Sequence, residues 1–406
     1  MLSKYRGHTF IVTVSGGKDS TVSLYLAHLC GIRNFIYCDT GFEFPETKDV
    51  INSLMSIVPI DIVEASRDMF EKMFDVLGPP ARDFRWCTQV CKLEPLKRYL
   101  RNWTGQKIVS ITGQRLFESP QRALAGYEKD VYGQNPADVI VSPLYEWTAL
   151  EVELYIHHKR LPLNKLYEEG FERVGCYICP TLRCSEIEII KKIHPDLWNS
   201  WYEKLKKFRR RVNAPEAWLK YDLWRWRFEL PGDLRNYLKR IGVSFDITSL
   251  TNPVCTVIRV DINRENLETV IEVFPTFLNK IDLIKLASLV PILSREYYVA
   301  DDSLKIYTKT SIIVVSSSGR IRVWSRDLEI CKNLTELIVK LIYMTHSCVK
   351  CKNCEEVCEE KILKVDDYPK IIEPERCTQC RECVKACFLA KYVGISTSKE
   401  VESRIV

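Results

Sequence analysis

The sequence predicts an α/β protein with a doubly wound parallel sheet, followed by a small α+β domain and a cysteine-dense C-terminal domain. Three observations predict this organisation. Apolar strands alternate with amphipathic helices in the first half of the chain, alternating apolar residues flank a glycine turn in the second half, and cysteines crowd the end. For 406 residues the length predicts two to four domains, and we place three, at 1–230, 231–345 and 346–395.

Four apolar segments of the first domain are predicted to be strands, at residues 10–14, 34–38, 61–65 and 107–112. A helix follows the first strand, because apolar residues recur at helical spacing from Val22 to Leu29, and Gly31 ends it. This alternation is typical of a parallel sheet, in which ligands bind at the carboxyl ends of the strands. Three of the four strands end in polar stretches that converge on one crevice, "SGGKDS", "DTGFEFPET" and "GQRLFES".

The second half begins with a tryptophan- and arginine-rich helical stretch at 195–228. Beyond it we predict a strand at 255–260, a helix at 265–274, a hairpin at 305–324 that turns at "SSSGR", and a helix at 328–343. No motif in this small domain indicates a function. The tryptophan-rich stretch has two interpretations, RNA binding or a helix that buries its tryptophans and leaves its charges in water, and we favour the second.

The composition is that of an ordinary globular protein, with 46% hydrophobic and 28% charged residues. A net charge of +6 is mild for this length, so it allows an anionic partner without requiring one. No apolar run reaches membrane-spanning length and no signal-peptide pattern precedes the first strand, so we expect a cytoplasmic protein without a membrane partner. In that compartment 17 cysteines point to metal or redox chemistry rather than to disulfides.

The turn after the first strand, "SGGKDS" at residues 15–20, predicts an anion site. Two glycines let the backbone approach a ligand, and the N–H groups and positive dipole end of the new helix favour phosphate or sulfate. The pattern differs from GxxxxGK[ST] and GxGxxG. It resembles the PP-loop of the ATP pyrophosphatase superfamily, which implies that an adenine nucleotide binds there.

Two cysteine runs near the end, "CVKCKNCEEVC" and "CTQCRECVKAC", share the spacing C-x2-C-x2-C-x3-C. This spacing is typical of a two-cluster bacterial-type ferredoxin, in which the fourth cysteine of each run reaches the other cluster. We assign one 4Fe-4S cluster to Cys348, Cys351, Cys354 and Cys387, and the other to Cys358, Cys377, Cys380 and Cys383. Zinc is the alternative, although zinc modules usually separate two CxxC pairs.

Four further segments follow the PP-loop in order, "YCDTGFEFPET" (37–47), "RWCTQVCKLEPL" (85–96), "TGQRLFESPQR" (112–122) and "NKLYEEGFERVGCYICP" (164–180). Together they resemble the phosphoadenosine phosphosulfate reductase family, a branch of the PP-loop enzymes, over roughly residues 8–230. The resemblance implies an anion loop at Ser15, Gly16, Gly17, Lys18, Asp19 and Ser20, a nucleoside beside Asp39 and Gly41, and an anionic end beside Lys92, Gly113, Arg115 and Arg122.

Arginine and lysine suit phosphate and sulfate on physical grounds as well, because a guanidinium offers a planar fork and an ammonium a point charge. Three of these residues also have structural interpretations. Arg122 and Arg115 could form surface ion pairs, and Asp39 could cap the next turn. Thioredoxin-dependent members of the family carry a nucleophilic cysteine in an "ECG" segment, which this sequence lacks. We therefore assign no catalytic residue.

A third cysteine group lies inside the first domain. Adenylyl sulfate reductases of the family hold a 4Fe-4S cluster with an adjacent cysteine pair and a later CxxC, and here the pair is spread as "CTQVC". The candidates are Cys87, Cys91, Cys176, Cys179 and Cys184. We expect Cys87, Cys176, Cys179 and either Cys91 or Cys184 to hold a 4Fe-4S cluster or a zinc ion, the alternative being unligated buried thiols.

Two functions of different classes follow from these features. The first is a reductase that binds an adenylyl sulfate at the PP-loop and reduces it to sulfite with electrons from the ferredoxin-type domain, which itself needs an electron donor. The second is ATP-dependent sulfur transfer, with Mg²⁺, to tRNA or another acceptor through an adenylated intermediate. A nucleotide-sensing electron carrier is a third interpretation, but it leaves the anion crevice without a task.

Overall fold

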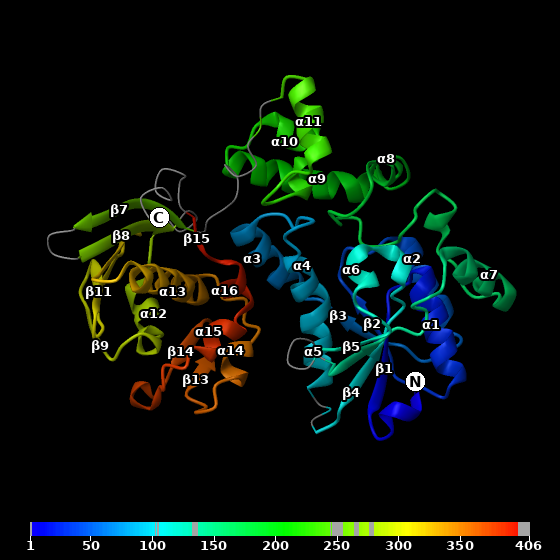
Figure 1. The fold of residues 1–406 in the computed structure, drawn as a ribbon, viewed down its shortest axis with the longest axis horizontal. Coiled ribbons are helices and arrows are strands. Elements are labelled where there is room, and N and C mark those ends of the chain that lie inside the picture. The colour runs from blue at the N-terminus through cyan, green and yellow to red at the C-terminus, as the bar shows by residue number, and fades with distance from the viewer. Residues whose placement is uncertain are drawn as a thin grey trace. The chain divides into compact units, whose positions relative to one another are not determined.

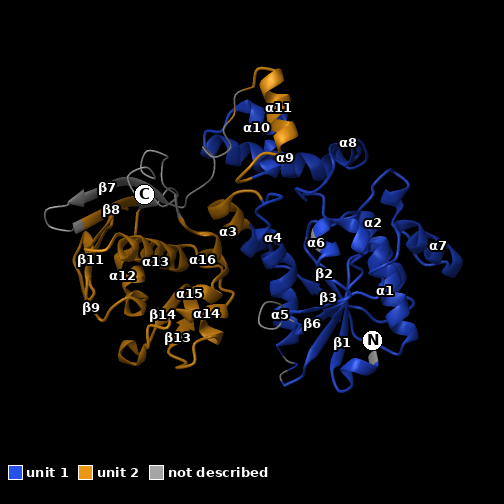
Figure 2. Cartoon of the chain, in the orientation of Figure 1, with its two compact units in different colours: residues 1–70, 80–226 blue, residues 71–79, 227–406 orange. Residues whose placement is uncertain are grey.

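The computed structural model describes residues 2–101, 103, 105–131, 137–243, 245, 255–263, 268–275 and 280–396. The chain divides into two compact units (Figure 2). Unit 1 comprises residues 1–70 and 80–226, and unit 2 comprises residues 71–79 and 227–406. Unit 2 thus contains both the predicted small domain and the predicted cysteine-rich domain, and the boundary between those two stays a prediction.

Unit 1 is built on a six-stranded sheet with the order β3-β2-β1-β4-β6-β5 (Figure 1). All neighbouring pairs are parallel except β5 with β6, which is antiparallel. The prediction of an α/β parallel sheet is confirmed, and two short strands, β6 and the edge strand β5, were missed. The strands are β1 (Thr9–Val14), β2 (Phe35–Asp39), β3 (Asp61–Glu64), β4 (Ile108–Ile111), β5 (Glu128–Asp130) and β6 (Val139–Val141).

Apolar side chains on both faces explain why this sheet is covered on both sides. On β1, Val12 packs in one cluster with α1 (Lys18–Leu29) and α2 (Pro45–Met55). Its neighbour Ile11 points to the opposite face and packs with α5 (Glu94–Leu100). Successive strand residues alternate between faces, so the apolar run of β1 serves both layers.

Helix α1 is buried on two sides, which places its first turn deep in unit 1. One side packs on the sheet, and Val22 on the other side packs with Val152 and Ile156 of α7 (Ala149–Lys159). The remaining helical elements used below are α3 (Arg67–Leu77), α4 (Trp86–Thr88), a π-helical turn (Gln89–Leu93), α6 (Pro120–Ala123), α8 (Cys184–Ile193), α9 (Pro195–Arg211) and α10 (Glu216–Lys220).

The tryptophan-rich stretch packs its aromatic side chains inward. In α9 the buried residues are Trp198, Trp201, Leu205 and Phe208, spaced at three and four residues along one face. Lys207 and Arg210 on the other face are exposed. This pattern agrees with the packing interpretation of the stretch.

Unit 2 contains a seven-stranded sheet with the order β15-β7-β8-β12-β11-β10-β9 and a two-stranded sheet, β13-β14. The predicted hairpin is confirmed as β11 and β12, which pair antiparallel with Val315 opposite Ile321. The strands are β7 (Cys255–Asn263), β8 (Glu268–Pro275), β9 (Glu296–Val299), β10 (Ser303–Tyr307), β11 (Ser311–Ser316), β12 (Ile321–Ser325), β13 (Leu363–Val365), β14 (Pro369–Ile371) and β15 (Ile395–Ser396).

The predicted helix at 265–274 is wrong, because residues 268–275 form β8; residues 264–267 lie outside the described residues. β8 pairs with both β7 and β12, and Thr269, Ile271 and Val273 on one face are buried. β-Branched residues favour a strand once partners are present on both sides. The helix predicted at 328–343 is confirmed as α13 (Leu328–His346). The shorter helices of unit 2 are α11 (Gly232–Arg240), α12 (Leu283–Ala287), α14 (Asn353–Glu356), α15 (Glu382–Ala386) and α16 (Phe388–Tyr392).

Membrane spans were also sought in both units. None of the helices in the described part of the chain combines the length and the apolar composition that a membrane span requires.

Candidate functional site

The loop between β1 and α1 is shaped by its two glycines. Gly16 has φ +72°, a left-handed conformation, and a Cβ atom there would lie 2.8 Å from Cγ2 of Thr47. Gly17 precedes α1 in an extended conformation and supplies no side-chain cap. The start of α1 therefore presents backbone N–H groups without a capping side chain of its own, which is the arrangement that anions bind.

The two serines of the loop bond to the loop itself. Ser20 Oγ accepts the backbone N–H of Ser15 at 3.1 Å and donates to the carbonyl oxygen of Gly17 at 2.9 Å. Ser15 Oγ lies 3.1 Å from Ser20 Oγ. These bonds fix the path of the turn without using the helix N–H groups.

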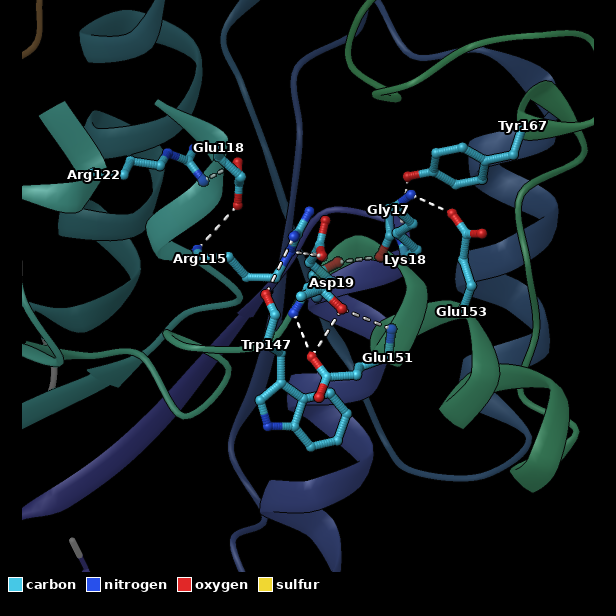
Figure 3. Close-up of polar contacts among 12 residues, drawn as sticks. Gly17, Lys18, Asp19, Arg115, Glu118, Arg122, Trp147, Glu151, Glu153 and Tyr167 are labelled. Carbon is cyan, nitrogen blue, oxygen red and sulfur yellow. Dashed lines mark hydrogen bonds and ion pairs between the residues drawn. The ribbon is translucent and has the colours of Figure 1, made fainter. Parts of the chain in front are cut away.

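Each charged side chain of the loop has a partner of opposite charge from a distant segment (Figure 3). Lys18 Nζ lies 2.5 Å from Oε1 of Glu153 on α7, and Asp19 Oδ1 accepts Nε of Arg115 at 2.5 Å. Arg115 also donates to the carbonyl oxygen of Trp147 at 3.3 Å. Burial raises the pKa of Asp19, and the Arg115 guanidinium opposes that rise. The predicted anion residue Arg115 therefore braces the loop.

Tyr167 holds the first turn of α1 from the other side (Figure 3). Its hydroxyl oxygen accepts the backbone N–H of Lys18 at 3.1 Å, and the Lys18 ammonium lies 5.1 Å from the centre of its ring. Burial raises the pKa of Tyr167 to about 12, so the phenol stays neutral at physiological pH. No separate sequence signal marks Tyr167 or Glu153, because each becomes a site residue only when the fold brings it to the loop.

Gly113, at the end of β4, is in close contact with the loop. A Cβ atom at this position would lie 2.6 Å from the carbonyl carbon of Asp19 and 2.9 Å from the backbone N of Ser20. No side chain fits at that distance, so glycine is required here. The ends of β1 and β4 thus meet at one point, as the doubly wound sheet predicts.

A cavity of about 1320 Å³ opens in front of this loop. It is lined mainly by parts of six segments of unit 1, at residues 13–20, 37–43, 85–96, 110–122, 148–157 and 163–186. All of the predicted polar stretches of the crevice contribute to it. Its volume exceeds the few hundred cubic ångströms of a usual small-molecule site, and is ample for a nucleotide.

Three predicted residues do not line the cavity: Gly16, Asp39 and Gly41. Asp39 Oδ1 accepts the backbone N–H of Gly41 at 2.8 Å and lies near Lys48, with Oδ2 3.3 Å from Nζ. This is the turn-capping arrangement that the sequence left open for Asp39. Whether these residues touch a nucleoside stays a prediction.

The charges on the cavity wall are largely balanced. Seven lysines and arginines line it together with seven aspartates and glutamates. Arg122 forms an ion pair with Glu118, as the alternative interpretation of Arg122 expects. Arg173 differs, because it makes no hydrogen bond or ion pair within the described residues. Burial lowers the pKa of Arg122, and the charge of Arg173 adds to this effect. A cation without a carboxylate partner is available to an anionic ligand.

Four of the five candidate cysteines of unit 1 line the same cavity: Cys87, Cys91, Cys176 and Cys179. Cys184 does not line it. Cys87 belongs to α4 and Cys91 to the π-helical turn, in which the N–H of Glu94 donates to the carbonyl oxygen of Gln89. This wider turn brings Cys91 and Lys92 to the cavity wall along with Cys87.

Basic groups surround these thiols. Cys176 donates a hydrogen bond to Cys179, which lowers the pKa of Cys179, and the Arg85 guanidinium lowers it further. Burial lowers the pKa of Lys92. Its neighbours, led by Cys176 and the Glu43 carboxyl, raise that pKa by more, so the net shift is upward. Of the four cavity thiols only Cys179 has a lowered pKa, because burial raises the pKa of Cys87 and Cys91 and the hydrogen bond to Cys179 raises that of Cys176. Cys179 is therefore the cavity cysteine that most favours the thiolate, which is the form that binds metal.

The two C-terminal cysteine runs fold in the same way. Lys350 and Gln379 each follow a first cysteine by two residues and have φ +57° and +59°, and Lys352 and Arg381 at the next equivalent position have φ +63° and +64°. Left-handed residues other than glycine are uncommon, so the shared pattern is specific. Such turns aim successive N–H groups at one point, as in many iron–sulfur sites.

The backbone of these runs already bonds to sulfur, since the N–H of Lys350 donates to Cys348 Sγ at 3.3 Å. The thiols also group as the spacing predicts. Cys354 interacts electrostatically with Cys387, Cys351 and Cys348, and less with Cys383 of the other set. Cys383 interacts with the other predicted set, Cys358, Cys377 and Cys380. The donors fit two clusters, and ligation itself stays a prediction.

A site for a single metal ion was also sought. Among the described residues, no three or more histidine, cysteine, aspartate or glutamate side chains are grouped so that they could hold one ion. A cubane cluster keeps its four thiolates farther apart than one ion does, so this finding does not test clusters.

Comparison with known proteins identifies the region around the cavity. Residues 9–182 match the family model described as "Phosphoadenosine phosphosulfate reductase domain". Two uncharacterized proteins of Methanocaldococcus jannaschii are 36% identical over 220 residues and 34% identical over 242 residues. These matches cover 53% and 59% of this chain and 45% and 56% of those proteins, so the chain spans about half the length of these relatives.

Sulfonucleotide reductases match the same region at lower identity. Adenosine 5′-phosphosulfate reductase 2 of Bacillus subtilis is 29% identical over 178 residues, which are 43% of this chain and 73% of that protein. Among solved structures, a phosphoadenylyl-sulfate reductase of Candida auris in a phosphate complex aligns with a TM-score of 0.35 and 19% identity, over 43% of this chain and 84% of that one.

Proposed function

We propose that this chain is an iron–sulfur sulfonucleotide reductase, because residues 9–182 match the family model of the phosphoadenosine phosphosulfate reductase domain and adenosine 5′-phosphosulfate reductases are similar to the same region. Its substrate would be an adenylyl sulfate, with or without a 3′-phosphate. Its electrons would come from the two cysteine runs of unit 2, once these are loaded with 4Fe-4S clusters and reduced by an external donor.

One observation carries this proposal: the PP-loop and four cysteines line a single cavity. The thiols place metal-binding or redox-active groups beside the loop that would hold the phosphates. A reductase needs an anion site and an electron-accepting or electron-donating group within reach of the same ligand. The cavity is also large enough for a nucleotide that bridges its two ends.

The chain's own groups have separable tasks in this scheme. The N–H groups at the start of α1 would bind an anionic oxygen, and the Lys18 ammonium lies beside them. Arg173 would bind a further anionic oxygen, since its guanidinium is uncommitted. Arg85 and Lys92 would neutralise charge at the sulfate end, because they lie next to the cysteines.

The reaction balances with two electrons. The bond between the sulfate sulfur and the bridging oxygen breaks, the oxygen stays with the nucleotide phosphate, and sulfur is reduced from sulfate to sulfite. A cluster on Cys87, Cys91, Cys176 and Cys179, or with Cys184 in place of Cys91, would supply electrons at that end. Low-potential clusters in unit 2 would supply electrons one at a time.

The deciding experiment is anaerobic. Reduced, iron-loaded protein is mixed in parallel with adenylyl sulfate, with its 3′-phosphorylated form, or with ATP, Mg²⁺ and bulk tRNA, while sulfite, AMP and pyrophosphate are followed. Sulfite that appears together with cluster oxidation supports the reductase and identifies the substrate. Absence of sulfite from both sulfonucleotides would contradict the proposal.

The exposed basic face of α9, which includes Lys207 and Arg210, favours ATP-dependent sulfur transfer to tRNA as a second candidate. In that case pyrophosphate appears without sulfite and only when RNA is present. The Lys207→Ala/Arg210→Ala double variant would then no longer release pyrophosphate when RNA is added. Under the reductase proposal the same variant keeps wild-type sulfite production.

A further inference from the structure

Two arginines of unit 1, Arg82 and Arg225, have no part in the proposed reaction, yet they bond densely beside the cysteines. Arg225 Nε donates to the carbonyl oxygen of Pro180 at 3.0 Å, and another of its nitrogens donates to that of Leu182. Arg82 Nε donates to the same Pro180 oxygen at 3.0 Å, and its Nη2 donates to the oxygens of Thr181 and Leu182 at 3.3 and 3.1 Å. Both guanidiniums hold one turn.

Arg225 is 2% exposed and comes from "WRWRF", the stretch for which the sequence allows RNA binding. Trp226 lies against both guanidiniums. The centre of its ring is 5.3 Å from Cζ of Arg82 and 5.2 Å from Cζ of Arg225. Two guanidiniums on one ring and one carbonyl oxygen repel each other. Neither forms an ion pair with a carboxylate within 4 Å in the described part of the chain. Arg82 is exposed, so the cost falls on Arg225, whose burial is unfavourable unless an anion lies nearby.

Two sulfur atoms lie near these guanidiniums. Arg225 Nη1 lies 3.4 Å from Cys184 Sγ, and Arg82 is within electrostatic range of Cys179 and Cys184. Arg85, on the cavity side, interacts in the same way with Cys179. Basic groups therefore surround the turn that carries "CYICP" on more than one side, which suits a metal–thiolate group with net negative charge.

The same contacts separate Cys184 from the other cysteines. Cys184 begins α8, is exposed, does not line the cavity, and has its sulfur bonded to Arg225. Cys91 is buried, lines the cavity and interacts electrostatically with Cys87. The sequence left these two as equal alternatives for the fourth ligand, and the structure distinguishes them by the position of Arg225.

We propose that Arg82 and Arg225 are positioning residues of a metal site on Cys87, Cys91, Cys176 and Cys179: they hold the turn at 180–182 by its carbonyl oxygens and keep Cys184 out of the ligand set. The inference rests on the proposed function, which supplies the metal. It assigns Arg225 of "WRWRF" to the cysteine site, so the guanidinium of Arg225 is not available to bind RNA.

The test measures metal, not turnover, on the full chain purified anaerobically with its unit 2 clusters. Iron and zinc per chain and the electron paramagnetic resonance spectrum are compared for wild type, Cys91→Ser, Cys184→Ser and Arg225→Met. We expect Cys91→Ser to lose roughly four irons per chain and one spectral component, and Cys184→Ser to keep both. We expect Arg225→Met to bind that metal about 10- to 100-fold more weakly in chelator competition.

Further variants keep the test decisive. Arg82 is exposed at its edge, so Arg82→Met should fold even where Arg225→Met does not, and it should weaken metal binding in the same direction. Arg225→Lys keeps the positive charge but loses the planar guanidinium with its paired N–H donors. We expect its metal affinity to lie between that of Arg225→Met and that of wild type. Arg210→Met, an exposed cation of α9 outside the cavity, is the matched control and should equal wild type.

The possible outcomes are distinguishable. Metal loss in Cys184→Ser, or wild-type affinity in both Arg82→Met and Arg225→Met, overturns the inference and leaves the proposed function standing. A wild type whose iron and zinc are fully accounted for by unit 2 overturns the metal site in unit 1 and this inference with it, whereas the reductase proposal is decided separately by sulfite release. Zinc in place of iron supports the positioning role but contradicts the proposed cluster.

Discussion

The cysteines of unit 1 and those of unit 2 are brought together in different ways. In unit 2, each predicted set takes three members from one short run, and the backbone of both runs winds alike, with left-handed residues at equivalent positions. In unit 1, Cys87 and Cys179 are far apart in sequence. The two arginines beside them, Arg82 and Arg225, are even farther from each other in sequence. The spacing of cysteines in the sequence predicts a local site. A site assembled by the fold depends instead on the contacts that position distant loops.

The largest effect is expected from a variant that adds a single methyl group where the fold has no room for one. Gly113→Ala places a Cβ about where the backbone of Asp19 lies, so one end of the PP-loop must move. We expect at least a 100-fold loss of AMP affinity by calorimetry, and a stability loss of about 1–3 kcal/mol in denaturant unfolding. Iron in unit 2 should be unchanged. Gly232→Ala, where a Cβ meets nothing within 4 Å, is the control.

The next variant breaks the local site instead. Cys358→Ser removes a predicted ligand that belongs to the first run by sequence but to the second cluster by position. We expect the loss of roughly four irons per chain and of one of the two unit 2 signals in electron paramagnetic resonance, with AMP affinity unchanged. Loss of both signals or of neither would contradict the assignment across runs.

A smaller effect separates stability from binding at the PP-loop. Tyr167→Phe removes the hydroxyl that accepts the N–H of Lys18, and leaves that donor at the start of α1 without its partner. We expect unfolding to require about 1 kcal/mol less free energy. Affinity for AMP should hold or rise, because a phosphate can take the freed N–H. A parallel fall in both quantities would show that the hydroxyl itself contacts the ligand.

The smallest expected effect concerns charge. Glu153 is paired with Lys18 but is partly exposed, so the pair contributes less than about 1 kcal/mol to stability after screening. Glu153→Gln frees the positive charge of Lys18 for an anion, and we expect AMP affinity to rise a few-fold at low salt. The gain should shrink as ionic strength increases. A salt-independent change would contradict an electrostatic cause.

The comparison also explains what the sequence could predict. β1, α1 and the parallel sheet follow from alternating apolar periods, and the PP-loop follows from glycines at a strand–helix junction, all of which are local signals. The partners of its charges, Glu153 and Arg115, come from segments whose positions depend on the whole sheet. Arg115 had a local signal as a strand-end residue, but its role as a brace for Asp19 required the fold.

The wrong helix at 265–274 and the disfavoured RNA interpretation of the tryptophan-rich stretch have a similar cause. The segment that became β8 has apolar spacing compatible with a helix, and only its pairing with β7 and β12 makes it a strand. The "WRWRF" stretch looks like a nucleic-acid surface because Trp and Arg alternate. Its arginine at 225 is instead 2% exposed and bonded to backbone carbonyls, which composition alone does not reveal.

The π-helical turn at Gln89–Leu93 has a consequence for relatives of this chain. A π turn holds one residue more than the α turn it replaces. Deleting a single residue there would let the segment rewind as a regular helix with its flanking turns in register, so the side chains of the turn itself would change direction. Lys92 would then swing away from the thiols while the cysteines remained in the alignment. A one-residue gap at this place in a homologue is therefore a change of chemistry, and should be counted as a substitution of the site rather than as a neutral difference in length.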